Sequence, residues 1–418
     1  LNATERYADV GTDGCANVME DGEGGCLPTT QEPVKSDPNG DDFHWLDNPL
    51  GTELNDRWDP GEPYDDNGLD GVLDTNDVGE SNGIFDTNSA LVRAKASDVS
   101  DLIMQLSDEA LSSLDLYFDS GIRDPLHAAV STRFAVAALN GRKADVQYFQ
   151  GIADRPTALF PTTAIEDVVN ELGNAALFSK ESMGTHVYVE YGDPDASQEA
   201  LDAGDGGHLG TIEEVLSRML TWCAFALHRL PEPDTEPTET FNVPESRSYF
   251  SEIFGARRNY TIVLPPGYDA NPEKRYPVLY LLHGLGQSPS EFANVAFVTG
   301  GLMANGLLPK AIQVYVDGTC CRVRKDNPGL RECACGDRTD GVRQCVDPQC
   351  TGPHESCEVR DIVETETESE CVRASLYLDL LTDRWGKRRD NMKYGTAVVE
   401  LVEHIDMTYR TRAALPAR

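Results

Sequence analysis

The chain has 418 residues, 40% of them hydrophobic, and its 71 Asp and Glu outnumber 35 Lys and Arg to give a formal net charge of −36. This length supports one large or two ordinary domains with a sizeable core. The negative charge argues against nucleic-acid binding, and no apolar run is long enough to predict a membrane span.

The first segment, residues 1–92, differs chemically from the rest of the chain. Its first ninety residues contain 22 Asp and Glu but only 3 Lys and Arg. Residues 37–42 and 65–77 place carboxylate and amide oxygens at every second or third position, with glycines between them. Hard cations such as Ca2+ take six to eight oxygen ligands from loops of this kind. The spacing resembles thrombospondin type 3 and related extracellular calcium loops.

We expect this acidic segment to bind structural Ca2+, with a disordered acidic spacer as the alternative. The predicted ligands are Asp65, Asn67, Asp70, Asp74, Asn76 and Asp86. Cys15 and Cys26 are predicted to form a disulfide within the same segment.

Residues 93–231 alternate between strand and helix patterns, which predicts parallel strands. Strands are expected from residue 114 to a turn at 124, at 146–149 and at 185–191, and helices at 127–139 and 212–230. Asp124 ends the Gly-x-x-Asp turn after the first strand. His208 lies in the glycine-rich run Gly204-Asp-Gly-Gly-His-Leu-Gly-Thr211 before the last helix. A helix-capping aspartate and a surface histidine are the simpler interpretations.

Residues 232–246, rich in Pro, Glu and Thr, are expected to form an extended linker. Residues 247–418 then begin with two predicted core strands joined by a Pro-Pro-Gly-Tyr turn. The second strand, 278–282, is continuously apolar, as in a strand buried on both faces of a parallel sheet, and it ends at His283-Gly284. A glycine at this point lets a main-chain amide approach a developing oxyanion.

The insertion at residues 319–371 contains eight of the eleven cysteines. An even number in a polar stretch predicts a disulfide-stapled insertion, with a zinc site as the alternative, and places the protein in an oxidising compartment. These cysteines are Cys320, Cys321, Cys333, Cys335, Cys345, Cys350, Cys357 and Cys371. Cys223, in an apolar helical stretch, is predicted to be a buried free thiol.

Residues 258–286 resemble the opening of an α/β-hydrolase of the esterase D family, which includes feruloyl esterases, S-formylglutathione hydrolase and mycolyltransferase-like enzymes. Residues 308–318 resemble the next core strand of that family, and residues 398–411 resemble the helix before its nucleophile strand. The resemblance implies a mostly parallel α/β-hydrolase sheet and a Ser-His-Asp mechanism. It implies His208 as the base, Asp124 as the acid, and oxyanion donors near His283, Gly284 and Leu285.

The Gly-x-Ser-x-Gly nucleophile elbow of the family is not found. Gly79-Glu-Ser-Asn-Gly83 fits the letters, but Asp-, Gly- and Asn-rich flanks replace the required strand and helix. Ser182-Met-Gly184 lacks the first glycine. The acid and the histidine also precede the oxyanion strand, which rotates the family order. A piece of a tandem pair, a truncated reading frame and a permuted fold without its nucleophile are all compatible with this order.

The sequence therefore predicts a secreted, periplasmic or cell-surface carboxylic ester hydrolase with no catalytic cofactor. Its substrate would be a small-molecule or polysaccharide-linked ester, and the oligomeric state is open. The alternative is a catalytically inactive, secreted calcium-binding or adhesion protein that retains the hydrolase scaffold.

Overall fold

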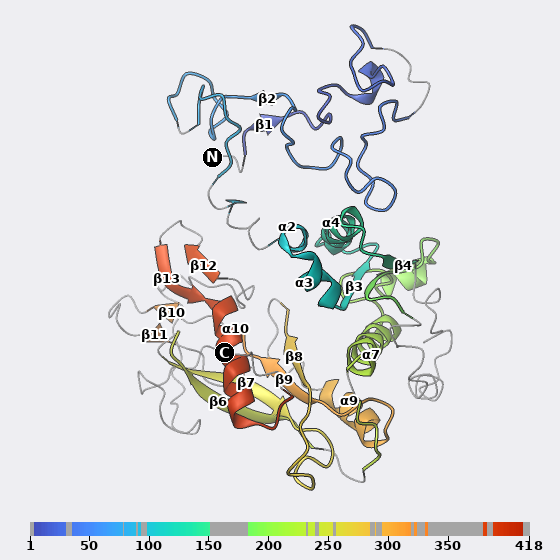
Figure 1. The fold of residues 1–418 in the computed structure, drawn as a ribbon, viewed down its shortest axis with the longest axis vertical. Coiled ribbons are helices and arrows are strands. Elements are labelled where there is room, and N and C mark those ends of the chain that lie inside the picture. Colours follow the sequence, from blue (N-terminus) through green and yellow to red (C-terminus); the bar gives the residue numbers. More distant parts are fainter. Residues whose placement is uncertain are drawn as a thin grey trace. The chain divides into compact units, whose positions relative to one another are not determined.

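The structure is a computed structural model that forms two compact units, Leu1–Ala164 with Ala176–Trp222, and Ile165–Ala175 with Cys223–Arg418 (Figure 1). It describes residues 4–30, 36–77, 79–88, 91–92, 98–150, 183–230, 233–238, 242–253, 256–284, 289, 295–318, 322–323, 331–332, 379–382 and 388–412. None of the helices within these ranges is long and apolar enough to cross a membrane.

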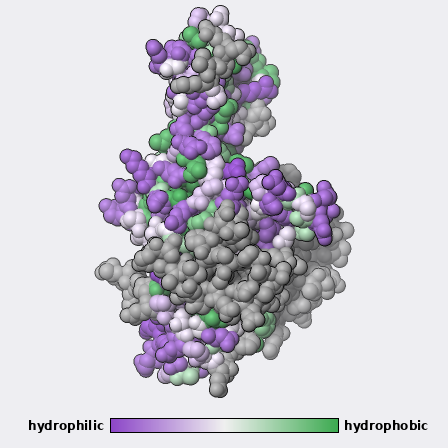
Figure 2. Space-filling view, turned by 90° about the vertical axis from the view of Figure 1, so that its right-hand side faces the viewer, coloured by the Kyte–Doolittle hydropathy of each residue, from purple (hydrophilic) through white to green (hydrophobic). Residues whose placement is uncertain are grey.

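The acidic segment at the start of unit 1 is built mostly from turns. Strand β1 (Arg6–Tyr7) pairs antiparallel with β2 (Tyr64–Asp65), and a short 3-10 helix, η1, spans Asn17–Met19. The predicted Cys15–Cys26 disulfide is present. Trp58 and Phe85 stack with ring centroids 4.5 Å apart, so a small aromatic cluster holds the loops together. On the face drawn in Figure 2, hydrophilic residues are interspersed with scattered hydrophobic ones over this segment, at the top of the view.

The rest of unit 1 confirms the predicted alternation of strands and helices. Its elements are α2 (Val99–Gln105), α3 (Asp108–Ser113), β3 (Leu116–Gly121), α4 (Ala128–Gly141), β4 (Val146–Gln150), β5 (His186–Tyr191), α6 (Gln198–Asp202) and α7 (Ile212–His228), which continues into unit 2. The strands form a parallel sheet of order β3-β5-β4, in which Leu116 and Val146 both pair with His186. Every residue of the central strand β5 is buried.

Unit 2 contains a four-stranded sheet of order β6-β7-β9-β8. Its main elements are β6 (Glu245–Ser251), β7 (Ala256–Val263), β8 (Val278–Leu282), α9 (Val295–Ala304), β9 (Ile312–Val316) and α10 (Tyr394–Thr408). Two short antiparallel pairs are also present. Strand β10 (Arg322–Val323) pairs with β11 (Arg331–Glu332), and β12 (Asp379–Thr382) pairs with β13 (Arg388–Lys393). Leu401 and Ile405 of α10 pack into the core beside Tyr260 and Val314.

Two expectations for unit 2 need correction. The sheet is mixed rather than mostly parallel, because β7 runs antiparallel to both β6 and β9 while β8 and β9 are parallel. The predicted doubly buried strand β8 is only partly buried, and Leu282 is 44% exposed. Among the described strands β8 pairs only with β9, so it lies at a sheet edge, whereas β9 is buried throughout.

The described part of the expected linker, residues 233–238, has no regular secondary structure but is anchored to unit 2. The Lys310 amide donates to the Asp234 carbonyl oxygen at 2.8 Å, and Thr238 donates to Ala304. The Asp234 carboxylate lies 2.7 Å from Lys274 Nζ and 3.7 Å from Lys310 Nζ. The carboxylate of an acidic residue in the expected linker is therefore buried against two lysines.

Candidate active site

His208 and Asp124, which are 84 residues apart in the sequence, meet in unit 1. His208 Nδ1 lies 2.8 Å from Asp124 Oδ2. The Asp124 side chain is 2% exposed, whereas the His208 side chain is 52% exposed. The structure thus pairs the two residues predicted as base and acid, with the carboxylate inside and part of the imidazole open to solvent.

Strand β3 and the turn after it position Asp124. The Asp124 amide donates to the Gly121 carbonyl oxygen at 3.2 Å, which closes the turn. The Leu126 amide donates to Asp124 Oδ1 at 2.8 Å, leaving Oδ2 for the imidazole. Burial alone would raise the pKa of Asp124, but hydrogen bonds from His208 and Leu126 hold it below its usual value. The carboxylate is therefore ionised at neutral pH.

The glycine-rich loop 204–211 lies against the carboxyl ends of two parallel strands. Arg123 donates its amide to the Gly206 carbonyl oxygen at 2.8 Å. The Tyr191 hydroxyl, at the end of β5, donates to the carbonyl oxygens of Gly207 and His208 at 2.8 and 2.9 Å. Burial raises the pKa of Tyr191 to about 12, so the hydroxyl keeps its proton for this interaction. The backbone of His208 is fixed from both strands.

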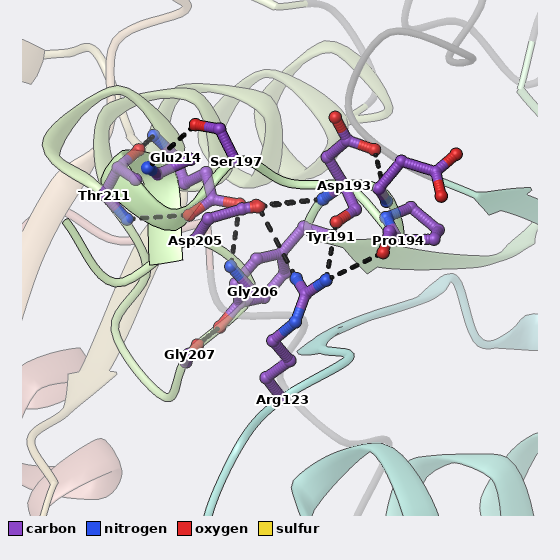
Figure 3. Close-up of polar contacts among 12 residues, drawn as sticks. Arg123, Tyr191, Asp193, Pro194, Ser197, Asp205, Gly206, Gly207, Thr211 and Glu214 are labelled. Carbon is purple, nitrogen blue, oxygen red and sulfur yellow. Dashed lines mark hydrogen bonds and ion pairs between the residues drawn. The ribbon is translucent and has the colours of Figure 1, made fainter. Parts of the chain in front are cut away.

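Charged side chains complete the support of this loop, as Figure 3 shows around Arg123 and Asp205. Asp205 accepts the Asp193 amide with both carboxylate oxygens, at 2.9 and 2.8 Å, and lies 3.7 Å from Arg123 Nη1. At the start of α7, the Thr211 amide donates to Glu214 Oε2 at 2.7 Å and the Glu214 amide donates back to Thr211 Oγ1. This reciprocal pair is a capping box that fixes the end of the loop to the helix.

Arg218 on α7 holds a second side of the loop. Its guanidinium donates to Asp119 Oδ1 through Nε and Nη2, at 3.0 and 2.7 Å, and to the Leu209 carbonyl oxygen at 2.9 Å. It also lies 4.1 Å from the centroid of the Tyr191 ring. Sequence reasoning missed Arg218. A lone arginine among apolar residues of a core helix was the available signal.

This arrangement suits proton transfer at the exposed side of the imidazole. The carboxylate of Asp124 accepts from Nδ1, which fixes the tautomer of neutral His208 with its proton on Nδ1. Nε2 is then the nitrogen that accepts a proton, and the buried carboxylate stabilises the imidazolium that forms.

The predicted oxyanion residues lie at the end of β8 in unit 2. The His283 ring is buried, with Nε2 accepting the Gly318 amide at 3.0 Å and Nδ1 lying 3.0 Å from the Gly284 carbonyl oxygen. This places the proton on Nδ1 and ties the end of β8 to the loop after β9. Gly284 is exposed, and Leu285 lies outside the described residues. The oxyanion role stays a prediction.

Neither Ser81 nor Ser182, the two candidate nucleophiles, lies in a described strand-turn-helix elbow. Ser81 is exposed in a turn of the acidic segment with a φ of 56°. Ser182 lies outside the described residues, although Met183 is buried directly before β5. His186, a further histidine of unit 1, is buried at the start of β5, with Nδ1 3.0 Å from Thr185 Oγ1. The nucleophile is therefore not assigned.

The six predicted calcium ligands are spread over turns of the acidic segment. Asp70 accepts the Val72 amide and the Thr75 hydroxyl, and Asp86 accepts Asn82 Nδ2. Within the described part of the chain, Asp65, Asp70, Asp74 and Asp86 form no group of three carboxylates close enough to share an ion. Binding by this set stays a prediction.

The predicted cysteine chemistry is described only in part. Cys223 is a buried free thiol, as expected, and burial raises its pKa to about 12. The eight cysteines of the insertion, Cys320, Cys321, Cys333, Cys335, Cys345, Cys350, Cys357 and Cys371, lie outside the described residues.

Comparisons with known proteins found similar solved structures and one family model. Solved structures similar to this chain include a ferulic acid esterase (19% identity, TM-score 0.25, 41% of this chain and 47% of that chain). Others are an S-formylglutathione hydrolase from Agrobacterium tumefaciens (14%, 0.24, 42% and 49%) and a ferulic acid esterase from Anaeromyces mucronatus bound to ferulic acid (17%, 0.22, 44% and 49%). The chain thus spans about half the length of these proteins. No curated protein matches it.

The Esterase family model matches residues 251–328. This stretch carries β7, β8, α9 and β9, and it includes the strand end at His283-Gly284. This segment is therefore similar to the esterase family.

Proposed function

We propose that this chain supplies the base, the orienting acid and the oxyanion strand of a secreted carboxylic ester hydrolase of the esterase D type. The observation that carries the proposal is the hydrogen bond of 2.8 Å between His208 Nδ1 and the buried Asp124 carboxylate. The esterase match of residues 251–328 supports the same reaction class independently.

In this mechanism a serine hydroxyl attacks the ester carbonyl while His208 Nε2 takes the serine proton. The resulting oxyanion would be held by main-chain amides after β8. The imidazolium then protonates the departing alcohol as the C–O bond breaks, leaving an acyl-serine. A water molecule, deprotonated by Nε2, then attacks this acyl group. The acyl–serine bond breaks as the imidazolium returns its proton to the serine oxygen, and the carboxylic acid leaves. Asp124 remains ionised throughout.

The disulfide between Cys15 and Cys26 supports an extracellular or periplasmic location. Disulfides form and persist in oxidising compartments and are rare in the cytosol. A small-molecule or polysaccharide-linked ester is the substrate class that we propose.

Labelling with a fluorophosphonate probe tests the proposal on the full chain. We expect labelling of one serine, identified by peptide mass spectrometry, and loss of labelling in His208→Ala. Asp124→Asn keeps the side-chain shape but favours the wrong imidazole tautomer, so its labelling rate should fall by about 10^3 to 10^4. Asp195→Asn, an exposed aspartate of the same unit, is the matched control and should label like the wild type.

Absence of labelling in a folded wild-type chain, together with no hydrolysis of p-nitrophenyl acetate, would overturn the proposal. The chain would then be a catalytically inactive scaffold, and the calcium-binding or adhesion role would replace the enzymatic one. Equal labelling of His208→Ala and the wild type would also reject His208 as the base.

A further inference from the structure

Three carboxylates of the acidic segment converge at a place that the ligand spacing in the sequence did not indicate. One oxygen each from Asp13, Glu20 and Asp41 lies within 4.8 Å of the other two. Glu53 is buried, and its carboxyl group lies beside that of Glu20. Three carboxylates from separate turns therefore surround one small volume, with a fourth next to Glu20.

Several oxygens in this cluster are buried without a donor. Glu20 is 5% exposed and Glu53 is 2% exposed, and neither Glu20 Oε1 nor Glu53 Oε2 has a hydrogen-bond partner. Asp41 Oδ1 and Asn17 Oδ1 are also buried oxygens without a hydrogen-bond partner. A buried carboxylate oxygen without a partner costs several kcal/mol, and native proteins satisfy nearly all such atoms.

Two other buried acids of the same segment, Glu5 and Glu62, accept hydrogen bonds with both carboxylate oxygens. Glu5 accepts the Gly68 and Asp86 amides, one with each carboxylate oxygen. Glu62 accepts the Val10 and Gly11 amides with Oε1 and the Asp59 amide with Oε2. The segment satisfies these two carboxylates with its own backbone, so the donor-free oxygens at Glu20 and Glu53 form a distinct group.

No protein cation compensates the cluster among the described residues. The ion pairs that described residues of the acidic segment form, His44 with Asp47 and Arg57 with Asp101 of α2, do not include the cluster carboxylates. The cluster therefore gathers negative charge that no described lysine or arginine offsets through an ion pair.

The backbone around the cluster is cross-linked before any ligand binds. The Cys15–Cys26 disulfide joins the turn of Asp13 to the residues after Glu20. Asn39 donates its amide to Glu20 Oε2 at 2.7 Å and its side-chain amide to Asp13 Oδ2. The Glu53 amide donates to the Asp41 carbonyl oxygen at 2.9 Å. These contacts hold four turns in place, which lowers the ordering cost of binding.

We propose that Asp13, Glu20, Asp41 and Glu53 bind one Ca2+ ion, with Asn17 Oδ1 as a further oxygen ligand. The donor set is entirely oxygen, and the thiols of Cys15 and Cys26 are locked in the disulfide, so it suits a hard cation rather than zinc. Four carboxylates on separate, irregular turns match the irregular coordination of Ca2+ better than the strict octahedron of Mg2+.

Isothermal titration of the metal-free full chain with CaCl2 tests this site. We expect Glu20→Gln and Asp41→Asn each to weaken the tightest Ca2+ site by about tenfold or more, because each removes a charged ligand. Asp74→Asn removes one of the ligands predicted from spacing, and Asp47→Asn removes an exposed aspartate outside the cluster. Both should bind Ca2+ at this site as the wild type does, and excess Mg2+ should compete only weakly.

Melting temperatures without Ca2+ show whether the variants fold. Replacing a carboxylate with an amide removes repulsion, so metal-free Glu20→Gln and Asp41→Asn should melt no lower than the wild type, while the rise on adding Ca2+ should be lost. The proposal is overturned if the wild type binds no Ca2+, or if Asp74→Asn loses the tightest site while Glu20→Gln and Asp41→Asn keep it.

Discussion

Two buried aspartates, Asp124 and Asp234, remain charged for different reasons. Asp124 accepts hydrogen bonds from an imidazole and a backbone amide and so serves the candidate site. Asp234 is 6% exposed at its side chain and faces Lys274 and Lys310, of which Lys310 is 3% exposed. For Asp234, burial alone would raise the pKa, but the hydrogen bond from Lys274 and the charge of Lys310 hold it below the usual value.

Asp234→Asn is expected to destabilise unit 2 strongly. The substitution leaves the buried ammonium of Lys310 without its counter-charge, and breaking a buried pair in this way costs about 3 to 5 kcal/mol. Glu236→Gln is the matched control, because Glu236 also lies near Lys274 but is 84% exposed. Urea unfolding of the variants at pH 7 measures both effects, and equal losses for the two substitutions would contradict the prediction.

The lowered pKa of Asp234 also sets the direction of its pH dependence. An aspartate whose pKa is lower in the folded state stabilises the fold above its unfolded pKa of about 3.9, and this contribution disappears as the pH falls through the folded pKa. The free energy of unfolding should therefore fall less steeply below pH 4 in Asp234→Asn than in the wild type.

At the scale of elements, the end of β3 and the loop that carries His208 interlock through backbone contacts. A Cβ atom at Gly121 would lie 2.3 Å from the Gly206 carbonyl oxygen and 2.5 Å from that of Gly207. A glycine in a strand commonly marks such a close approach. The position of His208 therefore depends on residue 121 of the neighbouring strand being a glycine.

Gly121→Ala should push the loop away from β3. We expect a loss of about 1 to 3 kcal/mol in stability from overpacking, and a drop in fluorophosphonate labelling at temperatures where the variant is still folded. Gly301→Ala, on α9 with nothing within 4 Å of its added Cβ, is the control and should be neutral or stabilising by up to about 1 kcal/mol. Unchanged hydrogen exchange in residues 204–211 of Gly121→Ala would count against the interlock.

The elements that sequence patterns predicted are those with continuous apolar runs or clear helical periodicity. Strands β7 and β8 and helices α4 and α7 were found in this way, whereas β9 was expected from family resemblance. Strand β6 was missed, because only Tyr249 and Ser251 of its seven residues are buried and its polar positions resemble a loop. Burial of β8 was overestimated, since an apolar run does not reveal how many strands flank it.

The candidate site, too, was predicted only in part. The pairing of His208 with Asp124 came from family resemblance, because contacts across 84 residues are invisible to local patterns. Charged residues of the interior were missed throughout: Arg218 is partly buried, and Glu20 and Glu53 are buried. These residue types are almost never fully buried unless they are paired. Such residues are recognised only when the tertiary structure shows their partners, or the lack of them.

At the scale of the whole of unit 1, aromatic contacts join the acidic segment to the α/β part. The Trp45 ring lies 4.9 Å from that of Tyr148 and 5.7 Å from that of Tyr188, and the Arg133 guanidinium lies 5.7 Å from the Trp45 ring. Phe43 stacks on Phe134 of α4 at 5.2 Å. A segment with high negative charge is thus held by apolar and cation-π contacts rather than by ion pairs alone.

Trp45→Ala should uncouple the unfolding of these two parts of unit 1. Removing a large aromatic side chain from a packed contact costs about 3 kcal/mol, and here that loss falls on the contact between the parts. In Trp45→Ala we expect amides of residues 4–88 to exchange with solvent faster than those of β5. In the wild type we expect both parts to be protected in one cooperative transition. Hydrogen exchange with mass spectrometry at saturating Ca2+ makes the measurement.

Leu46→Ala, a substitution at an exposed neighbouring residue, is the control and should leave exchange in both parts unchanged. Trp45→Phe retains an aromatic ring against Tyr148 and should restore most of the coupling. If Trp45→Ala lowers protection in residues 4–88 and β5 equally, the two parts form one cooperative unit whose stability does not depend on this contact alone. The acidic segment would then belong to the core of unit 1 rather than being docked on it.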